Sequence, residues 1–175
     1  DMGHAIALAT PVFFLMIGLS AVGFADDYIK IFWARSTGLR AKSKLIGQAG
    51  IAIVFALLAI RFPDVNGFTP ATQYISVVRD TAVFLPVGVY VVWVWFMVAS
   101  TSNAVNITDG LDGLATGAAA IVFGAYVTIG LWQYGNGCAQ VAVENCYAVR
   151  NPLDLAVVAG GLMGACFGFL WWNTS

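Results

Sequence analysis

Long apolar runs separated by short polar segments dominate this chain. Five of these runs carry at most one charged residue across about the length that a helix needs to cross a bilayer, which is roughly 20 residues. The predicted spans are residues 5–24, 45–62, 82–99, 114–134 and 155–172. Each run is apolar around its whole circumference, which suits a lipid or bundle interior better than a water-facing helix. The pattern predicts an all-α, polytopic transmembrane helix bundle that forms a single domain over residues 1–175.

The composition supports a membrane protein and argues against other classes. Of the 175 residues, 60% are hydrophobic and only 10% are charged, whereas soluble domains carry about 25% charged residues. A water-soluble globular domain, a disordered segment and a nucleic-acid-binding protein are therefore disfavoured. Three cysteines are too few for a disulfide scaffold, and their spacing does not suit a zinc site.

The few charged residues orient the chain in the membrane. Five of the eight Lys and Arg residues fall in the loop after the first span, at Lys30, Arg35, Arg40, Lys42 and Lys44. Because Lys and Arg concentrate in cytoplasmic loops, this loop, the third loop and the C-terminal end are expected on the cytoplasmic face. The fourth loop then faces outside, where a disulfide between Cys138 and Cys146 is chemically allowed but not required. Cys166 lies in a span and is interpreted as a packing residue.

Two adjacent carboxylates follow the first predicted span. Asp26 and Asp27 oppose the helix dipole at the carboxyl end of the span, at a cost of roughly 0.3–1 kcal/mol each, and they also repel each other. A bound metal ion or the lysines of the same loop would offset both costs. The alternative is that the pair marks a solvated helix end and has no other role.

The third loop, residues 100–113, combines amides, carboxylates and glycines. Its polar side chains recur at every third position, at Asn103, Asn106, Asp109 and Asp112. A helical or 3₁₀ turn places residues at this spacing on one side, and Gly110 and Gly113 allow tight turns and a close approach to a ligand. One such side chain could cap the following helix, but four exceed that need. The loop is therefore interpreted as a ligand-binding wall, although its spacing is not that of an EF-hand.

Four segments carry a family resemblance. They are GFADDYIK at 23–30, GLRAKSKLIGQ at 38–48, NAVNITDGLDGLA at 103–115 and FLWWN at 169–173. Together they resemble the phospho-N-acetylmuramoyl-pentapeptide transferases, a branch of the polyprenyl-phosphate N-acetylhexosamine-1-phosphate transferase superfamily. The resemblance covers essentially the whole chain. The Tyr28-x-Lys30 ending and the Gly-Leu-x-Ala-Lys-x-Lys run favour this branch over the sister branch that uses UDP-N-acetylglucosamine.

The resemblance implies a multi-pass protein of the bacterial inner membrane with ten helices, of which this chain supplies the third to the seventh. It implies Mg²⁺ as cofactor, UDP-N-acetylmuramoyl-pentapeptide as donor, and undecaprenyl phosphate as acceptor. Lipid I, a peptidoglycan precursor, and UMP are the implied products. The isolated chain is expected to be inactive. Whether the protein forms a homodimer stays open.

The resemblance also assigns roles to individual residues. By position, the catalytic residues are Asp26, Asp27, Asn106 and Asp109, and the metal ligands are Asp26, Asp27 and Asp109. The substrate-binding residues are Lys42, Lys44, Gly110, Asp112 and Asn173, and spacing alone does not decide between the two lysines. The main metal-binding aspartate of the family, in a Gly-Asp-Thr-Gly-Ser motif, would fall beyond Ser175.

The implied chemistry is phosphoryl transfer between two anions, which depends mainly on positioning and charge neutralisation. Direct attack by the acceptor phosphate is favoured, and a two-step route with Asp27 as nucleophile stays open. The alternatives are the sister transferase that uses UDP-N-acetylglucosamine and a transporter fragment that binds a cation. Transporter sites tend to lie at the bilayer midplane, where none of the predicted spans carries an ionisable residue.

Overall fold

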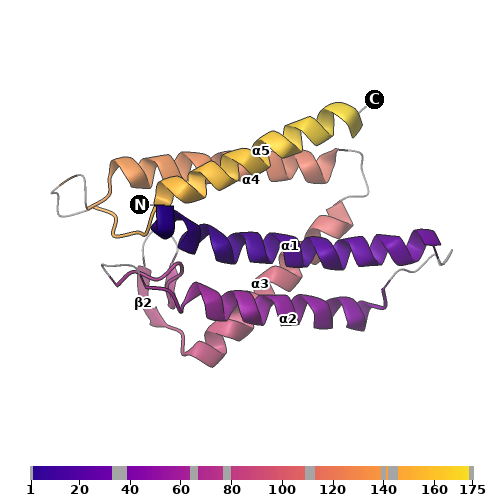
Figure 1. Cartoon of the computed structure of the whole chain (residues 1–175), viewed down its shortest axis with the longest axis horizontal. Coiled ribbons are helices and arrows are strands. Elements are labelled where there is room, and N and C mark those ends of the chain that lie inside the picture. The colour runs from indigo at the N-terminus through magenta and orange to yellow at the C-terminus, as the bar shows by residue number, and fades with distance from the viewer. Residues whose placement is uncertain are drawn as a thin grey trace. The chain divides into compact units, whose positions relative to one another are not determined.

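The computed structural model describes residues 2–32, 39–63, 67–76, 80–108, 113–138, 141 and 146–173. Within these ranges the chain forms five long helices and one β-hairpin (Figure 1). The helices are α1 (Met2–Phe32), α2 (Ala41–Ala59), α3 (Val87–Thr108), α4 (Leu114–Gly135) and α5 (Pro152–Asn173). The hairpin joins β1 (Tyr74–Ser76) to β2 (Asp80–Phe84), and it lies between α2 and α3 in the sequence.

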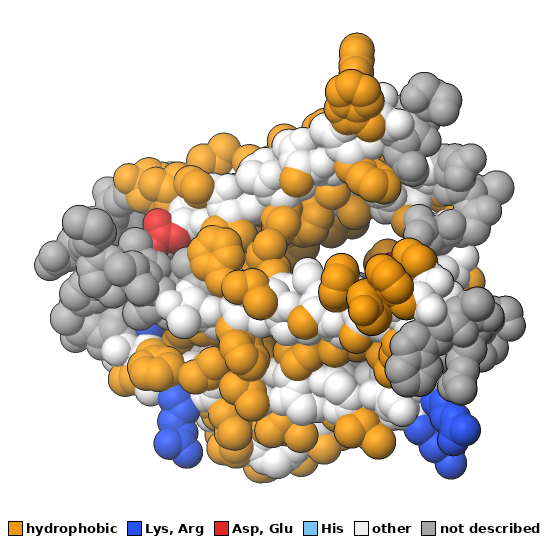
Figure 2. Space-filling model, turned by 45° about the vertical axis from the view of Figure 1, so that its right-hand side comes forward, with side chains coloured by type: hydrophobic (Ala, Val, Ile, Leu, Met, Phe, Trp, Pro, Cys, Tyr) orange, Lys and Arg blue, Asp and Glu red, His pale blue; other side chains and the backbone are white. Residues whose placement is uncertain are grey.

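All five helices are long and apolar enough to cross a membrane. Apolar side chains cover most of the described helix surface on the face that Figure 2 shows. A surface of this kind is favourable against lipid and unfavourable against water. The predicted fold class, a polytopic all-α membrane protein with five spans, is confirmed.

Three helix boundaries differ by more than four residues from the sequence-based expectation. The third span was predicted to begin at Ala82, but residues 80–84 form β2 and helix α3 begins at Val87, directly after Pro86. Proline has no N–H group to donate. It is therefore tolerated at the start of a helix, and it terminates the hydrogen-bond ladder between two strands. Apolar character alone does not separate a short strand from the beginning of a span. Helix α3 then continues to Thr108, nine residues past the predicted end at residue 99, so residues 100–108 of the predicted third loop are helical.

Helix α1 extends to Phe32, well past the predicted end at residue 24. Asp26 and Asp27 therefore lie inside the helix, in its last two turns, and not in a loop after it. The 23 residues from Thr10 to Phe32 are about 35 Å long at 1.5 Å per residue. This length exceeds the hydrocarbon core, which is about 30 Å thick, so the helix can carry the two carboxylates beyond the core without ending first.

The chain divides into two compact units, and the first consists of residues 10–101. In this unit α1 and α2 lie side by side and run in opposite directions (Figure 1). A Cβ atom added at Gly18 would lie 2.9 Å from Ile51 Cγ2, and one added at Gly47 would lie 3.3 Å from Val22 Cγ2. A step of four residues forward along α1, from Gly18 to Val22, thus corresponds to a step of four residues back along α2, from Ile51 to Gly47. These glycines let the two backbones approach closely, as small residues do between membrane helices.

The second unit consists of residues 1–9 and 102–175. Its helices α4 and α5 form an antiparallel pair that packs through small residues. A Cβ atom added at Gly130 would lie 2.8 Å from the Pro152 carbonyl oxygen and 2.9 Å from Ala156 Cβ. At the connection between these helices, Cys138 and Cys146 form a disulfide, which decides the alternative that the sequence left open. Cys166 is a free, half-buried cysteine of α5.

Candidate functional site

The last turns of α1 bring a lysine between two carboxylates. The Lys30 Nζ atom lies 2.6 Å from Asp26 Oδ2 and 3.3 Å from Asp27 Oδ1. The spacings are i to i+4 and i to i+3, which place side chains next to each other on a helix surface. One ammonium group therefore offsets the repulsion between the two carboxylates, as the sequence suggested that a lysine of this loop could do.

Asp26 also connects the end of α1 to the beginning of α2. Its Oδ1 atom accepts a hydrogen bond from the backbone N–H of Leu39 at 2.7 Å, and Leu39 lies two residues before α2 begins. The amino end of a helix has unpaired N–H groups and a partial positive charge, both of which favour a nearby carboxylate. The unfavourable interaction of the Asp26 carboxylate with the carboxyl end of α1 is thus offset by its favourable interaction with the amino end of α2.

The two aspartates differ in exposure. The side chain of Asp26 is 14% exposed, whereas that of Asp27 is 71% exposed. Lys44, half-buried in the first turn of α2, adds positive charge near Asp26, and Lys42 is exposed. Contacts to both carboxylate oxygens therefore fix the orientation of the Asp26 side chain, whereas the Asp27 side chain stays accessible from outside the helix pair.

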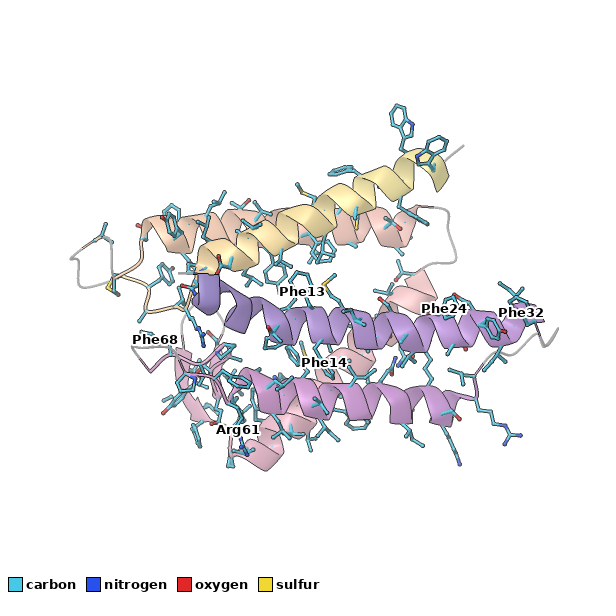
Figure 3. The ribbon with its side chains drawn as sticks, in the orientation of Figure 1. Phe13, Phe14, Phe24, Phe32, Arg61 and Phe68 are labelled. Carbon is cyan, nitrogen blue, oxygen red and sulfur yellow. A yellow bond between two sulfur atoms is a disulfide. The ribbon has the colours of Figure 1, made fainter. Side chains whose placement is uncertain are left out.

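An aromatic row follows a different face of the same helix end. Phe24, Tyr28 and Phe32 lie four residues apart, and their ring centroids are separated by 6.0 Å and 4.4 Å in turn. All three are exposed, and Figure 3 shows Phe24 and Phe32 on the last turns of α1. Tyrosine rings concentrate at the membrane interface, so Tyr28 in this row is consistent with a helix end that lies at the membrane surface.

The third-loop candidates belong to the second unit. Asn103 and Asn106 lie in the last turns of α3, the first half-buried and the second exposed. Asp109, Gly110 and Asp112 fall outside the described residues. Gly113, where the description resumes, has φ of 78° and precedes α4. This left-handed conformation favours glycine, and it agrees with the tight turn expected there.

The candidate residues divide between the two units. Asp26, Asp27, Lys42 and Lys44 belong to the first unit, whereas Asn106 and Asn173, the last residue of α5, belong to the second. Within the described ranges, no three His, Cys, Asp or Glu side chains form a group suited to a metal ion, and Asp109 lies outside these ranges.

Two partners of Asp26 were not among the site residues proposed from the sequence. Lys30 stands in the DDYIK motif, and its i+4 spacing from Asp26 is a usable signal. The backbone N–H of Leu39 leaves no signal in the sequence, because every residue except proline has that group.

Residues 9–175 match the family model described as glycosyl transferase family 4. A phospho-N-acetylmuramoyl-pentapeptide-transferase from Frankia casuarinae is 57% identical over 165 residues, which are 94% of this chain and 46% of the relative. Proteins of the same name from Streptomyces griseus and a Nocardioides species are 55% and 50% identical, over 94% and 100% of this chain and 47% and 49% of theirs. The chain thus spans about half the length of the curated relatives that it matches, and the resemblance seen in the four segments is confirmed.

Proposed function

Because the chain belongs to glycosyl transferase family 4, we propose that it is about half of a phospho-N-acetylmuramoyl-pentapeptide transferase. The full-length enzyme transfers the phospho-sugar from its UDP donor to undecaprenyl phosphate in the bacterial inner membrane, and it yields lipid I and UMP. The observation that carries the proposal is the carboxylate pair Asp26–Asp27, held at the end of a membrane-length helix by Lys30. A lipid-linked acceptor and a water-soluble donor can meet only at such a boundary.

In the proposed reaction, an oxygen of the acceptor phosphate attacks the donor phosphorus that carries the sugar. A new P–O bond forms while the bond from that phosphorus to the bridging oxygen of UMP breaks, and UMP leaves with the electron pair. The second pKa of a phosphate monoester is near 6, so the acceptor is largely ionised at neutral pH. Removal of a proton by a side chain then contributes little, and orientation and charge neutralisation carry most of the catalysis.

Mg²⁺ is part of the proposal, because carboxylate oxygens are the ligands that this ion prefers. Asp27 is the better candidate of the described pair, since it is the exposed one, and Asp109 would join it. When bound, the ion would neutralise charge on the donor diphosphate. Asp26 is proposed to position this end of α1 through Leu39 and Lys30.

The remaining assignments stay as proposals from the family pattern. Asn106 is proposed to act next to the diphosphate, and Asp112, Gly110 and Asn173 are proposed to contact the uridine part of the donor. Lys42 and Lys44, between which spacing does not decide, are both proposed to contact substrate phosphate: Lys42 is exposed, and Lys44 is half-buried in the first turn of α2.

The test is Asp27→Asn in the full-length protein, reconstituted with both substrates and assayed for UMP release. Loss of the negative charge should lower kcat by about 100-fold or more, as loss of one electrostatic contact to a transition state does. Asp154→Asn is the matched control, because Asp154 lies in the first turn of α5, apart from the proposed machinery. A wild-type rate in Asp27→Asn would contradict the proposed role.

The same assay separates the alternatives. Competition between the two UDP-sugars should leave the muramoyl-pentapeptide product dominant, and a preference for UDP-N-acetylglucosamine would identify the sister activity. Cation flux without UMP release would identify a transporter. A covalent phospho-sugar adduct trapped on Asp27 would replace direct attack by the two-step route.

A further inference from the structure

The β-hairpin between α2 and α3 presents aromatic side chains that the described part of the first unit leaves uncovered. Tyr74 of β1 and Phe84 of β2 are partners in the antiparallel ladder, so their side chains lie on the same face of the hairpin. Their ring centroids are 5.3 Å apart in an edge-to-face arrangement. The two residues are 45% and 52% exposed. They form a compact aromatic patch, called here the hairpin aromatic pair.

Backbone contacts hold this hairpin close to the ends of two helices. The Leu85 N–H donates to the Gln73 carbonyl oxygen at 2.8 Å, and Gln73 Nε2 donates to the Leu85 carbonyl oxygen at 3.0 Å, which closes the base of the hairpin. Leu85 lies two residues before α3 begins. On the other side, the Ala71 N–H donates to the carbonyl oxygen of Ala59, the last residue of α2, at 3.0 Å. The hairpin is thus fixed to both helix ends.

Those two helix ends mark the level at which the chain leaves the bilayer. Helices α2 and α3 each contain a membrane-length apolar segment, at residues 42–59 and 87–108. Such segments end where the hydrocarbon core meets the headgroups, so a hairpin fixed to their ends lies at that boundary. Figure 3 shows Arg61 and Phe68 at this end of the α1–α2 pair, opposite to Phe24 and Phe32. A cationic side chain directly after a span is typical of a membrane interface.

We propose that the hairpin aromatic pair inserts into the interfacial layer of the phospholipid bilayer and anchors the connection between α2 and α3 to the membrane. Lipid is the chosen occupant because the patch is continuous with the membrane boundary of the two helices. It also includes a tyrosine, whose ring is apolar while its hydroxyl group can stay hydrated. Thr81 is an exposed polar residue of the same strand, in the stretch between Asp80 and Phe84 where the ladder register is irregular. Thr81 Oγ1 donates to the Ile75 carbonyl oxygen at 2.7 Å.

The experiment uses the full-length protein in phospholipid nanodiscs, in a Cys166→Ala background. Any cysteine of the full-length protein outside this chain is also replaced by alanine, and Cys138 and Cys146 are bonded to each other, so a nitroxide label attaches only to the one introduced cysteine. The labelled variants are Phe84→Cys and Tyr74→Cys, with Thr81→Cys as the matched control at a polar position of β2 outside the aromatic pair. Collision of the nitroxide with oxygen, which concentrates in lipid, is compared with collision with a water-soluble nickel chelate. The oxygen-to-nickel ratio should be several-fold higher at the two aromatic positions than at position 81.

Two results would overturn the proposal. Equal ratios at all three positions, with ready collision with nickel, would place the hairpin in water. Weak collision with both reagents at positions 74 and 84 would place the pair against protein, such as the part of the full-length enzyme outside this chain. If Phe84→Cys does not fold, Tyr74→Cys tests the same face. Because none of these measurements depends on turnover, the result is independent of the proposed enzymatic activity.

Discussion

Lys30 is the side chain that makes two adjacent carboxylates compatible with one helix end. Its ammonium contacts both Asp26 and Asp27, and it does so in the last turn of α1, where a positive charge also interacts favourably with the helix dipole. Without this cation, two negative charges would face the negative end of the helix with only the Leu39 N–H as a short-range partner in the described segment.

Replacement of this lysine should affect turnover more than stability. Exposed helix pairs at i and i+4 contribute about 0.3–0.5 kcal/mol, and the Lys30 side chain is 43% exposed, so Lys30→Met should change the melting temperature only slightly. The two carboxylates would lose their shared counter-ion and separate, which should lower kcat by about 10-fold or more. Lys30→Arg keeps the charge and should retain more activity. UMP release and thermal unfolding, measured on the same preparations, check this. A large fall in melting temperature with unchanged kcat would contradict it.

Helix pairs packed through glycine are the next level of organisation. Gly130 of α4 lies against Pro152 and Ala156 of α5. A Cβ atom added at Gly124 of α4 would lie 3.4 Å from Met163 Sδ of α5. Alanines 120, 156 and 159 are buried along these helices. Without a hydrophobic driving force between helices in lipid, close van der Waals contact supplies much of the association. These small residues are therefore part of what holds the pair together.

A side chain at Gly130 should separate the two helices. Because an added Cβ atom would lie 2.8 Å from a backbone oxygen, which cannot move independently, Gly130→Ala forces α5 away from α4. Overpacking of this kind costs roughly 1–3 kcal/mol. Gly117→Ala, in the same helix but with no heavy atom within 4 Å of the added Cβ, is the matched control and should unfold at the wild-type temperature. Thermal unfolding in detergent measures both variants, and equal melting temperatures would rule out a tight contact at Gly130.

The whole chain is a multi-pass membrane protein whose loops alternate between the two sides. The cationic loop between α1 and α2 and the disulfide-bearing loop between α4 and α5 are separated by three helices, so they lie on opposite sides. Positive charge marks the cytoplasmic side, and disulfides persist in oxidising compartments outside the cytoplasm. The charge bias and the Cys138–Cys146 bond therefore support the same orientation from independent chemistry.

This orientation predicts the outcome of thiol labelling on intact cells. In a full-length background in which Cys166 and any cysteine outside this chain are replaced by alanine, Arg40→Cys should react with a membrane-impermeant maleimide only after the cells are opened. Cys138 and Cys146 should react from outside, and only after treatment with an impermeant reductant. Modification of position 40 from outside would reverse the orientation and with it the side on which the proposed chemistry occurs.

The sequence was most informative where a pattern has one structural meaning. Long apolar runs were sufficient for the five spans, the unequal loop charges predict an orientation that thiol labelling can test, and Gly113 indicated a turn that only glycine adopts easily. The start of α3 was missed because residues 82–84 are equally apolar as a strand and as a helix. The Asp26–Leu39 bond could not be predicted either, because its donor is a backbone group that depends on how α1 and α2 approach each other.

The glycine contacts between α1 and α2 make the number of residues between Val22 and Asp26 important for where the Asp26 carboxylate lies. Gly18 against Ile51 and Val22 against Gly47 fix the register of the pair, and Asp26 lies one further turn along α1. Each inserted or deleted residue between Val22 and Asp26 would turn the carboxylates by about 100° and shift them by about 1.5 Å along the axis. The length of this segment therefore sets the position of the carboxylates relative to α2. Its residue count is constrained by the carboxylate that it delivers to Leu39.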